Sequence, residues 1–173
     1  MSESVSVPGV AAVVVMGVSG AGKSTVGKLI ATRLDCPFRD ADSFHPIANI
    51  EKMSRGEPLT DDDRWPWLNA IAVWIGAHRA AGTTCVVTCS ALKRSYRDIV
   101  SDKQSADVRL VYLKGEFALI EARLKARTAH FMPPGLLRSQ FAALEEPGAD
   151  EHAITLSIDA VPEDIALRVT EKL

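Results

Sequence analysis

The sequence predicts an α/β fold, a three-layer sandwich with helices on both faces of a five-stranded parallel sheet. Three observations lead to this prediction. Apolar, β-branched runs alternate with helical segments along the 173 residues. The run VAAVVVM at residues 10–16 is continuously apolar, as expected of a strand that is covered on both faces. A glycine-rich loop then opens a helix, which is the usual order at the first strand of such a sheet.

The first half of the chain divides into two strands and three helices. After the strand at 10–16, a helix is expected at 24–34, with Val26, Leu29 and Ile30 on one side. CPFRD at 36–40 suggests a short second strand. Pro46 suits the first position of a helix that Gly56 would close. Thr60, followed by Asp63, is a capping-box variant that opens a long amphipathic helix ending at Gly82.

The second half continues the alternation. Strands are expected at 83–89, 108–114 and 154–159, and helices at 91–101, 116–127, 135–146 and 162–173. No internal repeat, low-complexity tract or linker divides the chain. We therefore expect residues 1–173 to form a single domain.

Composition limits the kinds of partner. The chain is 47% hydrophobic, enough for one core, and 20 Lys plus Arg stand against 22 Asp plus Glu, with a pI near 6.1. This balance argues against a nucleic-acid or anionic-lipid partner and favours small solutes. The first ten residues do not resemble a secretion signal, and the run at 10–16 is far too short to span a membrane, so a cytoplasmic location is expected.

Three cysteines and three tryptophans are best explained by packing. Cys85 and Cys89 lie four residues apart on one expected strand, about 13 Å apart, so they cannot form a disulfide within it. With Cys36 they are expected to be reduced thiols that behave as small hydrophobes. The three tryptophans, Trp65, Trp67 and Trp74, are expected in the core rather than on a base-stacking surface.

GVSGAGKS at residues 17–24 matches the phosphate-loop pattern G-x-x-x-x-G-K-[ST] in full. Its glycines let backbone N–H groups face a phosphate chain, and the helix N-terminus adds partial positive charge. Lys23 would reach the β- and γ-phosphates and Ser24 would ligate Mg²⁺. The alternative is a strand-to-helix turn with a chance lysine. The nucleotide-binding residues expected here are Gly17, Val18, Ser19, Gly20, Ala21, Gly22, Lys23, Ser24 and Thr25.

A phosphate loop alone does not indicate whether the γ-phosphate drives a switch, is hydrolysed or is transferred, so other motifs must decide. The base-reading motif N-K-x-D of guanine-nucleotide switches is absent, and the strand TCVVTCS ends in Cys89 and Ser90 rather than in a metal-binding aspartate. Asp40 and Asp42 lie two apart on an extended segment, so they would share a face at the carboxyl edge of the sheet. Asp40 could then serve the metal while Asp42 orients an acceptor hydroxyl and takes its proton. The alternative is a solvated acidic turn that caps the next helix.

The chain resembles the gluconokinase family of small P-loop kinases, within the shikimate-kinase-like and nucleoside-monophosphate-kinase-like group. The matching stretches run in order from about residue 16 to residue 150: MGVSGAGKST, DADSFHP, NIEKMSRGEPLTDDDRWPWL, CSALKRSYRD, VYLKG, EARLKARTAHFMP and LLRSQFAALEEPGAD. GEPLTDDDRWPWL and CSALKRSYRD are far more specific than the phosphate loop. The resemblance implies a P-loop nucleoside triphosphate hydrolase-type kinase fold with a mobile lid. It also implies ATP- and Mg²⁺-dependent phosphorylation of D-gluconate to 6-phospho-D-gluconate for the pentose phosphate or Entner–Doudoroff routes, commonly by a homodimer.

The resemblance also suggests which residues hold gluconate, whose carboxylate needs a cation and whose hydroxyls need donors and acceptors. Asp42 would be the base or orienting group, and Arg64, on a helical segment at about 45–82, would bind the acid end. Further candidates are His45, Arg55, Ser90, Arg97 and Gln140. For Arg55 and Arg97 a surface charge explains the residue as well, for Ser90 a helix cap does, and for Gln140 a surface amide does.

Two arginines lie at the start of the expected lid, which covers about 123–140. Arg123 and Arg127 lie four apart, so both emerge on one helix face, before TAHFMPPG. By resemblance, Arg127 would neutralise charge on the transferred phosphoryl group, Arg123 would pack against adenine, and DAVP at 159–162 would wrap the ring. Lid closure would exclude water. The alternative is a pair of ordinary exposed arginines.

Two other functions compete with gluconate phosphorylation. One is a kinase on the same scaffold that acts on a different sugar acid. The other is a regulatory protein that binds nucleotide without catalysis, which the presence of Lys23, Asp42 and the two arginines disfavours.

Overall fold

The structure, a computed structural model, describes residues 6–127 and 134–173. Its strands form one sheet in the order β2-β3-β1-β4-β5, and every neighbouring pair is parallel. The strands are β1 (Ala12–Met16), β2 (Phe38–Asp40), β3 (Cys85–Thr88), β4 (Val108–Lys114) and β5 (Ile154–Ser157). The predicted five-stranded parallel sheet is confirmed.

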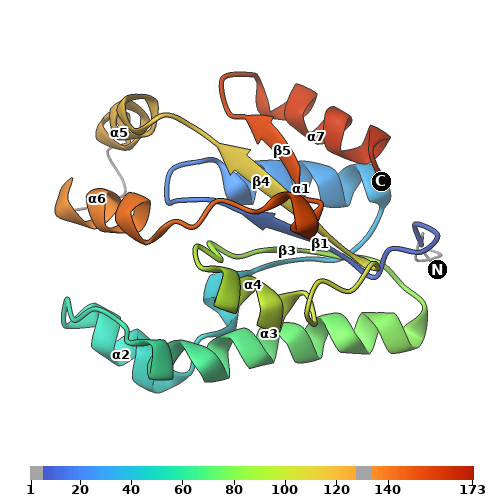
Figure 1. Ribbon diagram of the computed structural model, residues 1–173, viewed down its shortest axis with the longest axis horizontal. Helices are drawn as coiled ribbons and strands as arrows, with labels where there is room; N and C mark the ends of the chain where they lie inside the picture. The colour runs from blue at the N-terminus through green and yellow to red at the C-terminus, as the bar shows by residue number, and fades with distance from the viewer. Residues whose placement is uncertain (1–5, 128–133) are drawn as a thin grey trace.

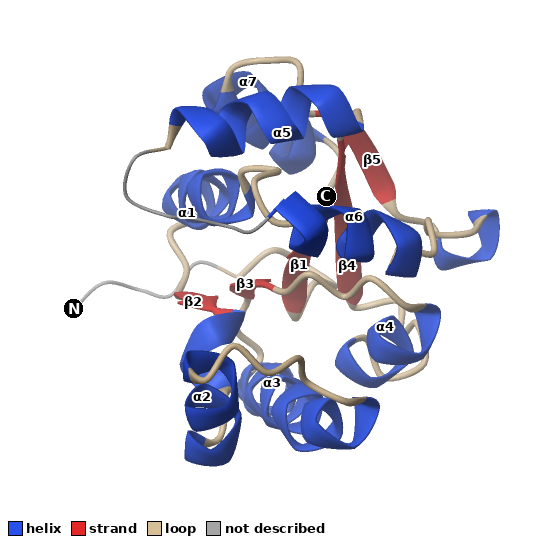
Figure 2. Ribbon diagram, turned by 90° about the vertical axis from the view of Figure 1, so that its left-hand side faces the viewer, coloured by secondary structure: helices blue, strands red, loops and turns tan. Residues whose placement is uncertain are grey.

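Helices cover both faces of the sheet (Figures 1 and 2). One face carries α1 (Lys23–Leu34), α5 (Phe117–Ala126), α6 (Pro134–Ala143) and α7 (Pro162–Glu171). The opposite face carries α2 (Ile47–Ser54), α3 (Asp61–Ala81) and α4 (Arg94–Val100). Two short 3₁₀ turns, η1 (Ala41–Phe44) and η2 (Ala149–Glu151), complete the described elements. The three-layer sandwich is therefore as the sequence predicts.

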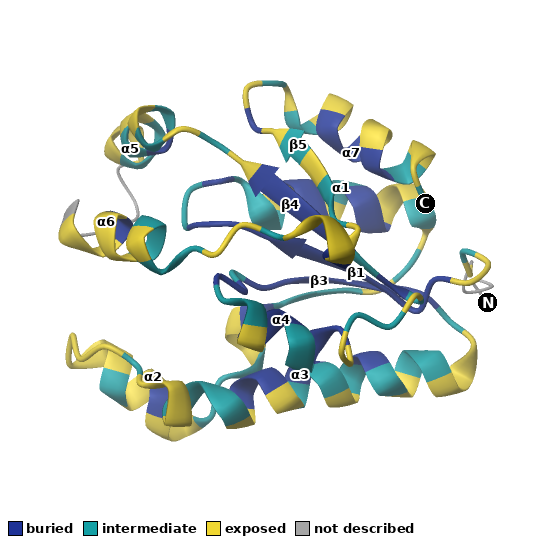
Figure 3. Ribbon diagram, viewed as in Figure 1, coloured by how far each residue is buried: buried dark blue, intermediate teal, exposed yellow. Residues whose placement is uncertain are grey.

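The burial of β1 explains its unbroken apolar sequence. Every residue of β1 is fully buried, and Figure 3 shows the central strands in the buried colour. Val13 and Val15 belong to the core cluster beneath α1 and α7, while Val14 and Met16 belong to the cluster beneath α3 and α4. Both faces of the strand are thus in apolar surroundings, and a polar residue at any of these positions would lose its hydration without a partner.

Local signals in the sequence set several helix boundaries. The side chain of Thr60 accepts from the Asp63 N–H while the Asp63 carboxylate accepts from the Thr60 N–H, so the predicted capping box is present. Gly82 ends α3 with φ +67°, a left-handed conformation that glycine adopts without strain. β4 has the predicted limits. The helix predicted at 91–101 is wrong at its start, because α4 begins at Arg94 and Ala91 has φ +45°.

The cysteines and tryptophans also follow the prediction in large part. All three cysteines are free, and burial raises the pKa of both Cys85 and Cys89 to about 12, so these thiols stay protonated. Trp67 is buried and its indole N–H donates to the Ala41 carbonyl at 2.8 Å, while Trp65 and Trp74 pack partly buried against the same core. Among the described helices, none combines the length and the apolar character that crossing a bilayer requires.

Candidate active site

The phosphate loop joins β1 to α1 at the carboxyl edge of the sheet. Gly22 is the N-cap of α1, with φ +91°, and because glycine has no side chain it supplies no capping oxygen. The first amides of α1 are therefore left to face an anion. Gly20 has φ +84°, and a Cβ there would lie 2.9 Å from Leu124 of α5, so the loop also needs glycine for space. The predicted phosphate loop has the geometry that phosphate binding requires.

Lys23 folds back over this loop. Its Nζ donates to the carbonyls of Gly17 and Val18, each at 3.0 Å. Burial lowers the pKa of Lys23 to about 8, although the charges of Asp40 and Asp42 oppose the shift. Arg127 acts in the same direction as burial. Lys23 is thus mostly protonated at pH 7. Its ammonium feels the charges of Asp40, Asp42 and Arg127, the residues that the sequence assigns to the metal, the acceptor and the phosphoryl group.

Asp40 links the phosphate loop to β2. The Ser24 hydroxyl donates to Asp40 Oδ2 at 2.6 Å, and the Asp42 N–H donates to Asp40 Oδ1 at 3.0 Å. The extended segment expected for the two aspartates is wrong, since β2 ends at Asp40 and Asp42 lies in the 3₁₀ turn η1. This turn, capped by the Asp40 side chain, leaves Asp42 exposed, and the charge of Asp42 raises the pKa of Lys23 against the larger effect of burial. Asp40 therefore contacts the phosphate loop directly, and Asp42 follows it by a different backbone path from the expected one.

His45 follows the turn that carries Asp42, and its backbone N–H donates to the Asp42 carbonyl at 3.4 Å. Its ring stacks on Trp67 with centroids 4.4 Å apart. The Asn49 amide nitrogen lies 3.3 Å from His45 Nδ1 and donates to the Asp63 carbonyl at 2.8 Å. A carbonyl only accepts, so this contact identifies the amide nitrogen and makes Nδ1 the acceptor, leaving the ring proton on Nε2. His45 is therefore held as a neutral imidazole with an N–H to offer a ligand.

The pH dependence of stability and turnover tests this protonation state of His45. Burial lowers the pKa of His45, with Arg64 in the same direction and Asp42 opposed. The unfolded chain then binds the proton more readily than the folded one, so the stability that the neutral ring contributes is complete above pH 6.5 and is lost as pH falls through the lower, folded pKa. We expect turnover to be independent of pH-dependent changes at His45 between pH 7 and 8, where the ring is neutral, and to fall as the pH drops below 6.5 and the ring takes up a proton. An NMR titration of the imidazole that gave a pKa above 6.5 would contradict this expectation.

Arg64 is held at the first turn of α3 by α4. Its Nη1 lies 3.4 Å from the Tyr96 hydroxyl and 3.7 Å from Asp61, and Tyr96 in turn donates to Asp61. Lys93 lies 3.7 Å from the same carboxylate. Arg64 is about one-third exposed. Sequence reasoning missed Tyr96 and Asn49, although Asn49 follows His45 by four residues, the spacing of neighbours on a helix.

Three predicted substrate ligands make contacts within the protein that differ from the expected ones. Gln140 uses both ends of its amide on Ser19, accepting from the backbone N–H at 2.7 Å and donating to the hydroxyl at 3.0 Å, so its contact is with the phosphate loop and not with the acceptor side. Arg97 is 1% exposed and bound to Glu151, so the prediction that it binds substrate is wrong. Ser90 is not a helix cap, because Lys93 has that place; its carbonyl accepts from the Gly17 N–H at 3.3 Å.

The remaining predicted residues keep their roles as predictions. Arg55 is exposed at the end of α2 and pairs with Glu57. Arg123 donates to the Ile158 carbonyl at 2.9 Å, next to the segment expected to wrap adenine. Arg127 is exposed where α5 ends. The centre of the predicted lid, residues 128–133, lies outside the described residues.

Comparison with known proteins agrees with this geometry. A family profile described as shikimate kinase matches residues 19–172. The thermoresistant gluconokinase of Escherichia coli K12 is 45% identical over 159 residues, 91% of this chain and 90% of that protein. The gluconokinase of Gluconobacter oxydans 621H is 47% identical over 150 residues, 87% and 84% of the two chains. A crystal structure of a gluconokinase from Sinorhizobium meliloti 1021 superimposes with a TM-score of 0.81 at 42% identity, covering 93% of this chain and 94% of that one.

A parallel sheet with a phosphate loop at its carboxyl edge, beside an aspartate pair, defines a P-loop kinase that acts on a small molecule. The identities and coverage above narrow this class. The chain belongs to the gluconokinase family, within the wider group that the shikimate kinase profile describes.

Proposed function

We propose that this protein transfers the γ-phosphate of ATP to D-gluconate, giving 6-phospho-D-gluconate in one direct in-line step. It is an enzyme, and curated gluconokinases that match it are 40–47% identical over most of the chain. The observation that carries the proposal is the position of Lys23, which lies over the phosphate loop within reach of the charges of both Asp40 and Asp42. This position supports a site in which the proposed phosphate-binding and acceptor-activating groups act together.

Mg²⁺ would bind at Ser24 and Asp40. This ion takes oxygen ligands, usually one or two from the protein with phosphate oxygens and water making up the rest. A hydroxyl and a carboxylate 2.6 Å apart beside the phosphate loop fit that donor set. Ser24 would ligate the ion directly and Asp40 would hold its water shell. When bound, the ion would neutralise charge on the phosphates and keep them in line with the acceptor.

The acceptor would lie between Asp42 and the first turn of α3. Asp42 is exposed and would accept the proton of the attacking hydroxyl. The neutral His45 would donate from Nε2 to a second hydroxyl, and the guanidinium of Arg64 would pair with the acid end of gluconate. Arg55, the C-cap residue of α2, is a further candidate for the sugar acid. In-line transfer needs no covalent intermediate, which agrees with the protonated thiol of Cys89.

The nucleotide would be held from the opposite side by α5 and the loop after β5. Arg127, whose charge reaches Lys23, would neutralise the phosphoryl group in transit, and Arg123 would pack against adenine beside Ile158. We further propose a single kinase domain with a substrate-binding segment at about 45–82 and a lid at about 123–140 that excludes water. A homodimer in the cytoplasm, with no nucleic-acid or membrane partner, completes the proposal, and the near-neutral charge balance supports its last part.

A coupled assay of ADP release tests the reaction. Purified protein with ATP and Mg²⁺ should release ADP at least about 100-fold faster with gluconate than without it, because the acceptor hydroxyl replaces water as the nucleophile. A panel of other sugar acids at equal concentration serves as the control for acceptor identity. Release at the same rate with and without every acid would refute the kinase, and a stronger response to a different acid would replace gluconate as the substrate.

A further inference from the structure

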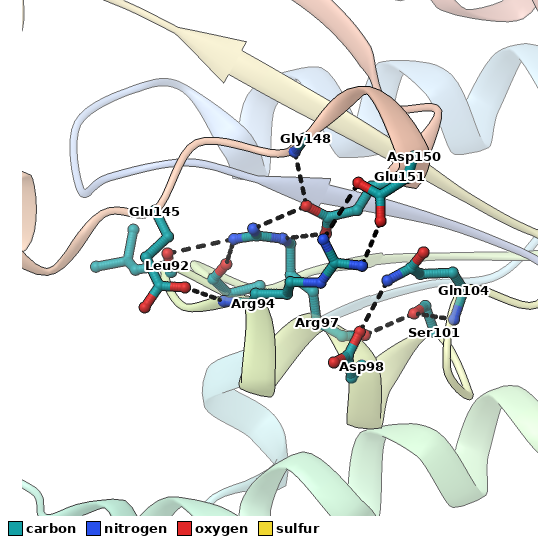
Figure 4. A network of polar contacts seen from close by, with 11 residues as sticks. Leu92, Arg94, Arg97, Asp98, Ser101, Gln104, Glu145, Gly148, Asp150 and Glu151 are labelled. Carbon is teal, nitrogen blue, oxygen red and sulfur yellow. Dashed lines mark hydrogen bonds and ion pairs between the residues drawn. The ribbon is translucent and has the colours of Figure 1, made fainter.

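A buried ion pair joins α4 to the segment that follows α6. Arg97 Nε donates to Glu151 Oε1 at 2.7 Å and Nη2 donates to Oε2 at 3.1 Å, and both side chains are 1% exposed (Figure 4). Such pairs stabilise proteins poorly, because desolvation of both charges offsets their attraction. What the guanidinium does provide is a rigid planar fork that fixes its partners in space.

The remaining nitrogen of Arg97 holds backbone. Its Nη1 donates to the carbonyls of Ala91 and Leu92, at 3.0 Å and 3.2 Å. Ala91 has φ +45°, a left-handed conformation that disfavours any residue with a Cβ, and it is 1% exposed. A strained residue of this kind persists only where its surroundings hold it. Arg97 binds the strained carbonyl itself.

The strained loop lies between the two halves of the active site. On one side, the carbonyl of Ser90 accepts from the N–H of Gly17, the first residue of the phosphate loop. On the other side, α4 begins at Arg94, and Tyr96 on that helix contacts both Arg64 and Asp61. A shift of this loop would therefore change the spacing between phosphate loop and acceptor residues.

The segment after α6 is fastened to the same loop. The N–H of Glu145 donates to the Leu92 carbonyl at 2.8 Å, and the Glu145 side chain accepts from the N–H of Arg94 at 3.0 Å. Glu151 also accepts from the N–H of Gly148 at 2.8 Å (Figure 4). One carboxylate thus closes its own turn and holds Arg97.

We propose that Arg97, clamped by Glu151, is a positioning residue that fixes the backbone at residues 90–92 and so sets the distance between the phosphate loop and the acceptor. The inference rests on the proposed function for its kinetic consequence. Misplacement by about 1 Å costs on the order of 100-fold in rate when a reaction depends on alignment. The loss should appear in kcat, since the amides that bind nucleotide belong to a different segment.

The test compares Arg97→Lys with Arg94→Lys. Lysine keeps the buried charge of Arg97 but cannot bind a carboxylate with two nitrogens and two carbonyls with a third. Arg94 is the matched control, because it lies on the same helix and joins the same segments through an exposed pair with Asp150, without contacting the 91–92 carbonyls. We expect kcat with gluconate to fall about 30- to 100-fold in Arg97→Lys and less than twofold in Arg94→Lys, with the Kd for ADP within about threefold in both.

Hydrogen exchange gives a readout that does not depend on the substrate. The Gly17 amide, which donates to Ser90, should exchange at least about tenfold faster in Arg97→Lys than in Arg94→Lys. Unchanged exchange and unchanged kcat, with only a lower melting temperature, would overturn the proposal, and so would equal losses in the two variants. If the wild-type protein does not use gluconate while Gly17 exchange still rises in Arg97→Lys alone, the proposed function fails and the positioning role stands. If Arg97→Lys does not fold, Glu151→Asp is the second variant, because the shorter carboxylate draws the guanidinium away from the carbonyls. Wild-type kcat and wild-type Gly17 exchange in Glu151→Asp would also overturn the proposal.

Discussion

Asp42→Asn is expected to lower kcat with gluconate by about 10³-fold while the Kd for ATP stays within about twofold. Asparagine has the same shape but cannot accept the proton of the attacking hydroxyl. The backbone of the turn should survive, because it is the Asp42 N–H, not its side chain, that binds Asp40. Single-turnover and steady-state measurements of ADP release, with ATP affinity from titration calorimetry, check the prediction.

The control for Asp42→Asn is Asp62→Asn. Asp62 is an exposed carboxylate in the first turn of α3 to which no proposed contact with substrate is assigned, so this variant makes the same change of charge without removing a proposed ligand. Its kcat should stay within about twofold of wild type. Near-normal turnover in Asp42→Asn would remove the base role, and a loss confined to KM for gluconate would leave Asp42 as a binding group without proton transfer.

The elements that the sequence predicts well are those fixed by local chemistry. The capping box at Thr60, the left-handed Gly82 and the doubly buried β1 each follow from a few adjacent residues, and all are present. The start of α4 does not follow, because residues 91–93 have ordinary helical side chains. The side chain of Arg97, on α4 itself, and the backbone N–H of Glu145, far along the chain, bind this stretch and hold it out of a helix.

The candidate site divides in the same way. The phosphate loop and Asp40 can be predicted from the sequence, since their spacing is set by strand, loop and helix in succession. The roles of Arg97 and Gln140 cannot be predicted from the sequence, because their partners Glu151 and Ser19 lie 54 and 121 residues away. An arginine that binds substrate and one that binds a buried glutamate look alike in a sequence. Only the fold, which brings Glu151 of η2 against Arg97 of α4, tells them apart.

Lys23→Met is expected to lower kcat/KM for ATP by about 10²- to 10³-fold, because methionine keeps most of the apolar stem but has no charge to offer the phosphates. Lys23→Arg is the control for charge: it should bind ATP better than Lys23→Met, although its bulk should hinder catalysis. Steady-state kinetics across an ATP series checks both variants. Activity within about threefold of wild type in Lys23→Met would contradict the phosphate-loop assignment.

The same residue links ATP binding to pH. Burial lowers the pKa of Lys23 to about 8, so as pH rises from 7 to 9 the free protein loses the ammonium that attracts phosphate. A bound triphosphate favours the charged form and raises this pKa, so binding near pH 8.5 should take up part of a proton, measurable by calorimetry in buffers of different ionisation enthalpy.

The free energy of unfolding should change with pH in the opposite direction from ATP affinity. Between about pH 8 and 10.5 the unfolded chain holds the proton that the folded one has released, so the contribution of Lys23 to stability rises with pH. Lys23→Met should abolish both the proton uptake and this slope while folding normally, since it removes a buried charge. Proton uptake that persisted in Lys23→Met would assign the linkage to another group.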